Sequence, residues 1–241
     1  ITVNRRPPTT CPNKWIFRIQ FYCINLQKMF SGLLRYIFIK NHTQMYKVFY
    51  NQKPVYFTSD LSKNSTTTPL FFIKYTDSKS IVKALRDKKV SEVYLYHSKE
   101  EKIKKYFHKT FSIVEAAGGL VQHKNGSYLF IYRNDKWDLP KGKIQKNEVI
   151  IEAACREVRE ETGVTDLIVK KSLPTTFHIY KANKKYKLKK TYWFLMKSSF
   201  TGSMTPQIEE NIERAVWKTK NEIPQIMENA YKNIHLVIDS I

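Results

Sequence analysis

The segment from Gly142 to Val164, GKIQKNEVIIEAACREVREETGV, constrains the fold of this 241-residue chain more than any other stretch. Its pattern predicts a helix over residues 148–162 that ends at Gly163, because glycine readily adopts the left-handed conformation of a helix end. Residues three and four apart share a helix face, and three carboxylates fall on one such face: Glu157, Glu160 and Glu161. The neighbouring face is apolar and suits packing on a sheet, so the segment predicts an α/β fold.

The three carboxylates repel one another unless a cation lies among them. Oxygen ligands without histidine or cysteine favour Mg²⁺, with Mn²⁺ as the alternative ion, over zinc. On these residues alone, a solvated acidic helix face with partners four residues away is the favoured explanation of the cluster.

The wider spacing decides between the two interpretations. The segment follows the pattern G-x5-E-x7-R-E-U-x-E-E-x-G-U, in which U is aliphatic. The matching residues are Gly142, Glu148, Arg156, Glu157, Val158, Glu160, Glu161, Gly163 and Val164. Seven fixed positions at ordinary residue frequencies coincide by chance in fewer than about one chain in 100,000. The segment resembles the signature box of the Nudix hydrolases, and this resemblance implies an α/β/α sandwich with a mixed sheet.

The resemblance also implies roles for the residues of the box. Glu160 and Glu161 are expected to be metal ligands, and Glu157 is expected to be a ligand or the general base. Arg156 is expected to orient Glu157, and Glu148 to support the metal shell through water. The metal ions would neutralise a diphosphate, orient it and activate water for attack on phosphorus.

Residues around the box resemble the family less closely. Residues 137–142 (WDLPKG) are similar to the entry strand of family members that act on nucleotides, so Lys141 and Trp137 become candidate substrate-binding residues. The backbone carbonyl of Lys141 is also a candidate metal ligand, and Trp137 either stacks on a base or belongs to the core. Tyr180 shares a strand face with His178 and is a third candidate for substrate contact.

Two further features concern the box and a later loop. Asn147 stands where many family members have glycine, and we expect no loss, because asparagine tolerates left-handed backbone. A late acidic loop is expected to add a metal ligand or base, and the sequence leaves open which residue does so: Glu209, Glu210 or Glu213.

Composition limits the partners. The formal net charge is +21, which favours anionic partners such as phosphates, nucleic acids or lipid surfaces. Lys181, Lys184, Lys185, Lys187, Lys189 and Lys190 crowd a predicted hairpin, where they are either a solvated loop tip or a steering patch for polyphosphate. Three scattered cysteines without a CxxC motif indicate a reduced, cytoplasmic protein. No apolar run approaches the length of a membrane span.

The chain divides into three parts by pattern. Residues 1–44 contain seven Lys/Arg and no acidic residue, and we expect a basic extension that is disordered or translated from upstream of a start at Met45 or Met29. An amphipathic anchor or targeting peptide is the alternative. Residues 45–111 predict a small α/β N-terminal domain, and residues 112–241 predict the Nudix domain.

These observations predict a Mg²⁺-dependent hydrolase of phosphoanhydride bonds. The expected substrate is a nucleoside diphosphate linked to another moiety, of the dinucleoside polyphosphate or nucleotide-sugar type. The alternatives are a hydrolase of non-nucleotide polyphosphates or damaged nucleotides, and a catalytically silent Nudix-like sensor or regulator. We expect a small-molecule nucleotide or polyphosphate as the partner. Nucleic acid is not the expected partner, although the basic charge is compatible with nucleic-acid binding. The sequence is also compatible with a homodimer.

Overall fold

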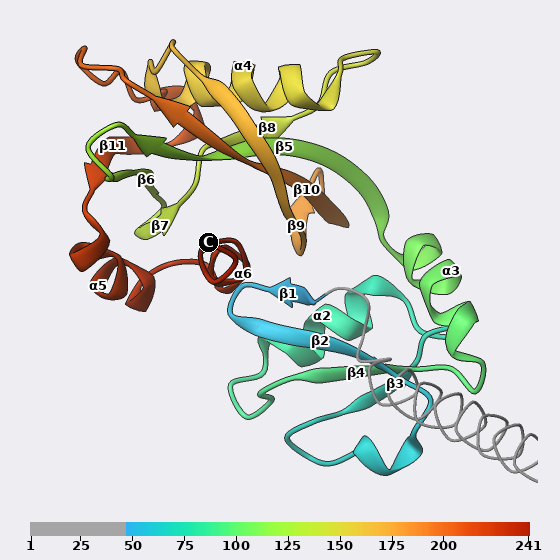
Figure 1. The fold of residues 1–241 in the computed structure, drawn as a ribbon. Coiled ribbons are helices and arrows are strands. Elements are labelled where there is room, and N and C mark those ends of the chain that lie inside the picture. Colours follow the sequence, from blue (N-terminus) through green and yellow to red (C-terminus); the bar gives the residue numbers. More distant parts are fainter. Residues whose placement is uncertain (1–46) are drawn as a thin grey trace, which may run out of the picture. The chain divides into compact units, whose positions relative to one another are not determined.

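One mixed sheet runs through residues 47–241, the part of the chain that this computed structural model describes (Figure 1). Its strands are β1 (Val48–Tyr50), β2 (Lys53–Thr58), β3 (Leu70–Phe72), β4 (Val93–Tyr96), β5 (Ser112–His123), β6 (Tyr128–Arg133), β7 (Lys136–Asp138), β8 (Lys141–Lys143), β9 (Ile168–Ala182), β10 (Lys185–Ser198) and β11 (Ile212–Lys218). The order across the sheet is β11-β6-β5-β10-β9-β1-β2-β4-β3, while β7 pairs with β6 and β8 pairs with β5.

Two of the helix ends have a distinct capping residue, at the start of α2 and at the end of α4. The α-helices are α2 (Ser78–Arg86), α3 (Glu100–Thr110), α4 (Ile150–Thr162), α5 (Ile223–Glu228) and α6 (Lys232–Ile238), and short 3-10 helices are η1 (Leu61–Lys63), η2 (Ile208–Glu210) and η3 (Lys220–Glu222). Asp77 caps α2, because its carboxylate accepts from the backbone N–H groups of Lys79 and Ser80. Gly163 ends α4 in the left-handed conformation, with φ 81°.

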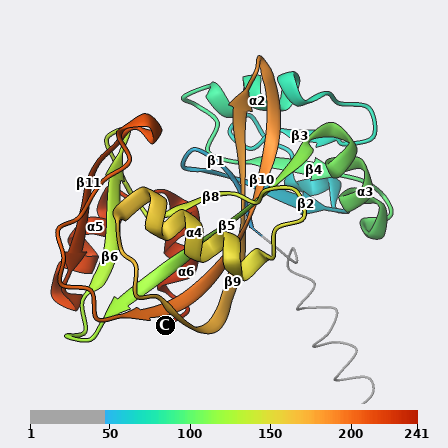
Figure 2. The ribbon, with the colours of Figure 1, turned by 90° about the horizontal axis from the view of Figure 1, so that it is seen from above.

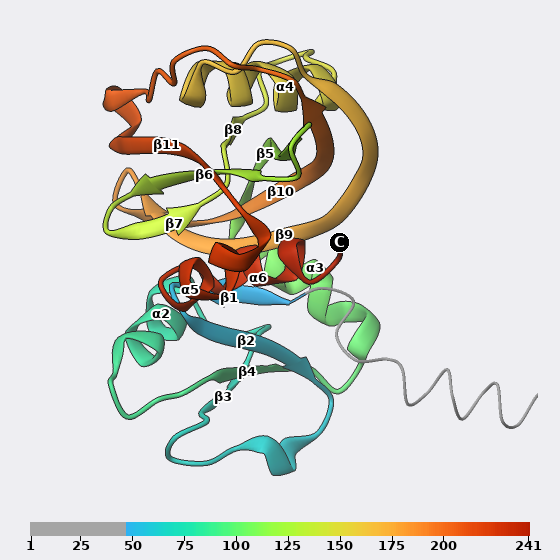
Figure 3. The ribbon, with the colours of Figure 1, turned by 60° about the vertical axis from the view of Figure 1, so that its left-hand side comes forward.

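Helices cover both faces of the sheet around the box helix. On one face, α4 packs on β5, β8 and β10 through Ala153, Ala154 and Val158 (Figure 2). On the other face, α5 and α6 contribute Ile226 and Ile234 to a separate core, and α6 packs against β9 and β1 (Figure 3). The layers confirm the predicted α/β/α sandwich with a mixed sheet.

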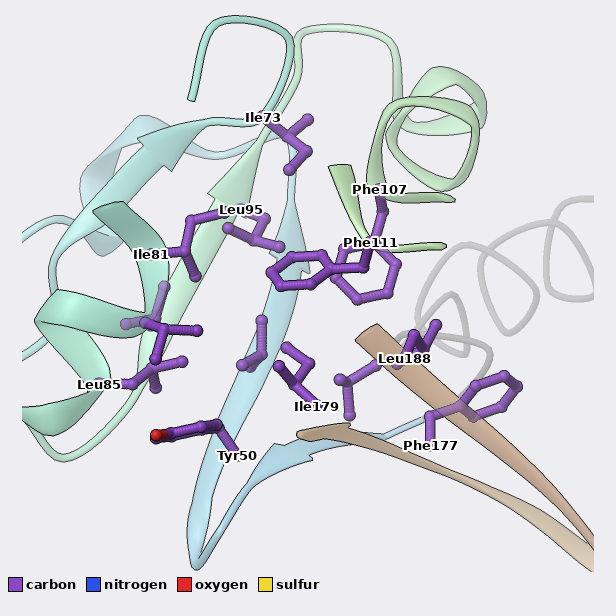
Figure 4. Close-up of a cluster of buried hydrophobic side chains, with 14 of the residues drawn as sticks. Tyr50, Ile73, Ile81, Leu85, Leu95, Phe107, Phe111, Phe177, Ile179 and Leu188 are labelled. Atoms are coloured by element: carbon purple, nitrogen blue, oxygen red, sulfur yellow. The ribbon is translucent and has the colours of Figure 1, made fainter. Parts of the chain in front are cut away.

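Residues 47–111 continue the same sheet. β1 pairs in parallel with β9, and Phe49 lies opposite His178. The core of this region also takes side chains from β9 and β10, since Phe177, Ile179 and Leu188 pack with Tyr50 (Figure 4). Residues 46–241 form one compact unit, and the division into domains at residue 112 stays a prediction.

The lysine-rich hairpin differs from the prediction. β9 and β10 are long and meet at Asn183 and Lys184, so most of the predicted loop tip is paired strand. Its residues Lys185, Lys187, Lys189 and Lys190 lie in β10, and Lys181 lies in β9. Alternating Tyr186 and Leu188 supply the apolar side of the extension, because Leu188 is buried in the core.

The C-terminal part of the chain folds as two short helices, α5 and α6. The break places Ala230 in a bridge with Trp137. Expectations for residues 1–44 lie outside the described residues. Within residues 47–241, no helix is long and apolar enough to cross a membrane.

Candidate active site

Arg156 holds three carboxylates of the box together. Its Nε donates to Glu148 (2.7 Å) and its Nη2 donates to the other oxygen of that carboxylate (2.9 Å). Its Nη1 donates to Glu157 and to Glu160, both at 2.8 Å. Nη2 also reaches the Lys143 carbonyl (3.1 Å), which ties the helix to β8. A planar guanidinium suits this arrangement. Arg156 contacts Glu157 directly, and its role of orienting Glu157 for the reaction stays a prediction.

The backbone before α4 brings the loop close to these carboxylates. A Cβ on residue 142 would overlap the Glu157 carboxylate, so Gly142 allows β8 to approach the helix closely. Asn147 has φ 65°, and its left-handed conformation is the one expected for this position. Gln145 then donates its backbone N–H to Glu148 (2.8 Å), which fixes the loop beneath the helix.

A cavity of about 500 Å³, here called the box pocket, lies at this site. Its lining residues are Gly142, Lys143, Ile144, Gln145, Lys146, Arg156, Glu157, Glu160, Gln207 and Glu210. Of the three late glutamates that the sequence left open, Glu210 from η2 lines this pocket, whereas Glu209 and Glu213 do not. The box pocket therefore gathers three carboxylates from two parts of the chain.

The electrostatics of the box pocket fit a cation. Burial raises the pKa of Glu157, Arg156 opposes that rise, and the neighbouring Glu160 and Glu210 raise the pKa further. Among residues 47–241, no three His, Cys, Asp or Glu side chains are grouped closely enough to hold a metal ion as they stand. Arg156 instead neutralises Glu157 and Glu160. The donor set is oxygen only, which suits Mg²⁺ or Mn²⁺ better than a softer metal.

The side chain of Glu161 does not line the box pocket, unlike those of Glu157 and Glu160. It is 1% exposed, accepts from the Lys141 backbone N–H (2.8 Å) and lies 3.5 Å from the Arg133 guanidinium. Burial raises the pKa of Glu161 to about 7, while Lys141 and Arg133 oppose the rise. The structure therefore places the third predicted ligand beside β8, outside the lining of the box pocket.

A second cavity, of about 180 Å³ and here called the basic pocket, collects most of the candidate substrate-binding residues. Its lining residues are Asn51, Arg133, Asp138, Lys141, His178, Tyr180, Lys189, Thr191, Tyr231 and Asn233. Lys141 and Gly142 are neighbours in β8, and successive residues of a strand face opposite sides. Lys141 thus lines the basic pocket, while Gly142 lines the box pocket.

Cations dominate the basic pocket. Lys141 pairs with Asp138 (2.8 Å), and Arg133 is shared with Glu161. Within the described chain, the Lys189 ammonium has no hydrogen bond or ion pair and lies 5.1 Å from the centre of the Tyr180 ring. Burial, and then the charges of Lys141 and Arg133, lower the pKa of Lys189 to about 8. An unpaired, crowded ammonium is a suitable contact for an anion.

His178 also lines the basic pocket, and its imidazole is neutral. Burial and then the charge of Lys189 lower the pKa of His178 to about 4. Its Nε2 accepts from the Asn51 backbone N–H (3.3 Å), so the ring proton is assigned to Nδ1. His178 and Tyr180 both line the basic pocket, as their shared strand face predicted.

Trp137 lies away from both pocket linings. Its ring packs against Tyr132, and the cations of Arg214 and Lys218 lie over it. It also packs against the core under α5 and α6. This placement matches the core interpretation of Trp137, while its stacking on a base stays a prediction.

Sequence reasoning missed several residues of the basic pocket, notably Arg133, Asp138 and Asn51, and it assigned Lys189 to a hairpin tip instead of a strand. The alternation of Tyr186 and Leu188 with lysines could have identified Lys189 as a strand residue. No comparable signal marks Arg133 or Asn51, because their meeting depends on how the strands pair across the sheet.

Comparisons with known proteins agree with the box. The family model described as NUDIX domain matches residues 113–237. The 8-oxo-(d)GTP phosphatase of Mycolicibacterium smegmatis (strain ATCC 700084 / mc(2)155) is 33% identical over 85 residues, which are 35% of this chain and 24% of that protein. This chain therefore spans about a quarter of the length of that relative.

Solved structures show more distant likeness. The Ap4A hydrolase of C. elegans in a binary complex is 22% identical, with a TM-score of 0.42, over 53% of this chain and 93% of the other. The MutT protein of Methanosarcina mazei Go1 is 20% identical, with a TM-score of 0.42, over 54% and 92%. These likenesses are too distant to support an argument about substrate.

The matched family model covers half of the chain and includes the entire box. This chain belongs to the Nudix hydrolase family.

Proposed function

We propose that this protein hydrolyses a phosphoanhydride bond in a nucleoside diphosphate linked to another moiety, with Mg²⁺ as its ion. The observation that carries the proposal is the box pocket, in which Glu157, Glu160 and Glu210 meet beside a loop that Gly142 brings close. The basic pocket lies on the other side of β8, where Lys189 has no counter-ion within residues 47–241. Substrate phosphates would supply that counter-ion.

The residues divide the work in the proposed reaction. Glu160 and Glu210, which line the box pocket, would hold the ion, with the Lys141 carbonyl as a further oxygen donor. Glu161 lies outside that lining and would join them by turning away from the Lys141 N–H. Bound Mg²⁺ would neutralise the diphosphate and make water a better nucleophile. Arg156 keeps Glu157 in place, and burial gives that carboxylate a raised pKa, which suits proton acceptance. Water adds to one phosphorus, its proton passes to Glu157, and the bridging P–O bond breaks.

The test is turnover of a substrate panel by the full chain with Mg²⁺ and with EDTA. Dinucleoside polyphosphates, nucleotide sugars and inorganic polyphosphate belong in the panel. We expect Mg²⁺-dependent release of a nucleoside phosphate from one of the first two classes. Equal turnover in EDTA would refute the role of the ion, and no turnover of any phosphoanhydride would refute the hydrolase proposal.

A second candidate is hydrolysis of a damaged nucleotide. The 33% identical segment of the 8-oxo-(d)GTP phosphatase supports it. Adding 8-oxo-dGTP and dGTP to the panel separates the two candidates, because a damaged-nucleotide hydrolase must prefer the oxidised base.

A further inference from the structure

The turn between β1 and β2 brings a residue from outside the matched Nudix region to the basic pocket. β1 pairs in parallel with β9, so the end of β1 lies beside the strand that carries His178 and Tyr180. Asn51 follows directly and lines the pocket with both residues. The family match begins at residue 113, so Asn51 belongs to a part of the chain that the match leaves without a role.

Contacts on both sides hold this turn in place. The Asn51 backbone N–H donates to His178 Nε2 (3.3 Å), and the Gln52 side-chain amide donates to the Ala230 carbonyl (3.2 Å). Behind the turn, Tyr50 is buried in the shared core, and its hydroxyl accepts from Arg86 Nε (3.0 Å). Figure 4 shows Tyr50 in the same cluster as Ile179, a residue of β9. The turn is therefore fixed before a ligand arrives, which lowers the entropic cost of binding.

The Asn51 side chain is suited to recognising a neutral polar group. It is exposed at the pocket, and within residues 47–241 its amide has no hydrogen-bond partner. An amide offers both donors and an acceptor, like the edge of a base or the hydroxyls of a sugar. The cations come from other strands, since Lys141, Lys189 and Arg133 lie on β8, β10 and β6.

The size of the cavity supports a division between its interior and its rim. At about 180 Å³ it falls below the roughly 300 Å³ at which pockets for drug-sized ligands begin, so it holds only part of a nucleotide. The phosphates suit the cationic interior. The rest of the ligand must extend past the rim, where Asn51 is exposed.

We propose that Asn51 is a specificity-determining residue that hydrogen-bonds the nucleoside part of the substrate. Residues 47–111 then serve substrate selection by presenting the Asn51 turn to the Nudix domain. The proposal rests on the proposed function for the identity of the ligand, but it concerns binding and not bond cleavage.

The test compares two asparagines with the same backbone conformation. Asn51 has φ 53°, and Asn183, in the exposed turn between β9 and β10, has φ 48°. Glycine adopts this conformation readily, so Asn51→Gly and the control Asn183→Gly each remove an amide and keep the turn. Equal melting temperatures for both variants and wild type establish that the turns are intact.

Binding is measured by calorimetry on the full chain in EDTA, with ADP, GDP, CDP, UDP and inorganic pyrophosphate as probes. We expect wild type to bind at least one nucleoside diphosphate more tightly than pyrophosphate. Asn51→Gly should weaken that nucleotide about 3- to 10-fold, the loss of one or two hydrogen bonds, and leave pyrophosphate unchanged. Asn183→Gly should change neither.

Asn51→Asp provides a second variant, because aspartate also tolerates the left-handed turn. Its charge should weaken all of the probes, so the readout is the ratio of nucleotide to pyrophosphate affinity, which should fall as it does in Asn51→Gly. An unchanged ratio in both variants overturns the proposal. Wild type that binds pyrophosphate as tightly as every nucleotide also overturns it.

The test of Asn51 can fail or succeed independently of the proposal that the protein is a hydrolase. If no panel substrate is turned over with Mg²⁺ while Asn51→Gly still loses nucleotide affinity, the proposed function fails and the assignment of Asn51 stands. If turnover is normal and the affinity ratio is unchanged, the assignment fails and the proposed function stands.

Discussion

The two sides of β8 differ in charge and in how completely their charges are paired. In the box pocket, carboxylates are in excess and one guanidinium binds Glu148, Glu157 and Glu160. In the basic pocket, Lys141 and Arg133 have carboxylate partners, while Lys189 has none among the described residues. The difference shows how neighbouring residues of one short strand can present a cation site and an anion site to the same substrate.

The largest expected effect is on the acidic side. Glu160→Gln or Glu161→Gln should lower kcat more than about 100-fold, since loss of even outer-shell partners of a metal costs 10- to 100-fold. Glu152→Gln is the matched control, because Glu152 is exposed on another face of α4. Steady-state rates at saturating Mg²⁺ measure the effect. A Glu160→Gln variant as active as the control would remove Glu160 from the metal site.

The next effect is on the basic side. Lys189→Met should raise KM for a polyphosphate substrate roughly 10-fold with little change in kcat. Lys184→Met, at the exposed hairpin turn, is the control and should act only at low salt, because salt screens surface charges more than buried ones. Kinetics at 0.05 M and 0.5 M salt distinguish the two. If the effect of Lys189→Met on KM vanishes in high salt, Lys189 acts by long-range attraction of the substrate and not by direct contact with it.

The pKa of Lys189 gives this comparison a pH dependence. With a folded-state pKa of about 8, lowered by burial, the ammonium loses its proton as the pH rises through 8. Wild-type KM should therefore rise roughly 10-fold between pH 7 and pH 9, relative to Lys189→Met. In the same window the unfolded state binds more protons, so wild-type stability should rise with pH relative to the variant. A KM difference that does not change with pH would contradict the lowered pKa.

Arg156 tests the fit of the acidic side to a cation without measuring activity. Arg156→Met leaves three carboxylates without their shared partner, and we expect a loss of about 2 kcal/mol, below the 3–5 kcal/mol of a fully buried pair. Added Mg²⁺ should then raise the melting temperature of the variant more than that of wild type, because binding to the folded state stabilises it. An equal response to Mg²⁺ in both proteins would argue against a cation site among these carboxylates.

Prediction from sequence succeeded where function depends on spacing along one helix. Glu148, Arg156, Glu157 and Glu160 meet because one helix and its preceding loop carry them all, so local periodicity was sufficient. Glu161 shared that helix face but is drawn to the Lys141 backbone, a contact that requires the position of β8. Its role as a metal ligand stays a prediction.

The basic pocket was not predictable in the same way. Arg133 and Lys189 come from strands separated in sequence and joined by sheet register, which a single sequence does not reveal. The lysines around 185–190 also obscured β10, because their charge is typical of an exposed loop. The order of strands that brings β1 beside β9 lay beyond local pattern altogether.

The smallest expected effect concerns the loop that joins β8 to α4, which contains Asn147. Asn147→Ala should cost about 1 kcal/mol of stability, because alanine adopts φ 65° at a penalty that asparagine largely avoids. Asn147→Gly should be close to neutral, and urea unfolding measures both. An alanine variant as stable as wild type would show that the loop relaxes without strain.

We propose that β8 separates bond cleavage from substrate binding. Single-turnover cleavage at saturating substrate with Mg²⁺, together with affinity for the same substrate in EDTA, tests it on Glu160→Gln and Lys189→Met. Glu160→Gln should bind within about 3-fold of wild type but cleave more than about 100-fold more slowly. Lys189→Met should cleave within about 3-fold of wild type but bind roughly 10-fold more weakly. Slow cleavage by saturated Lys189→Met, or lost affinity in Glu160→Gln, would contradict the separation.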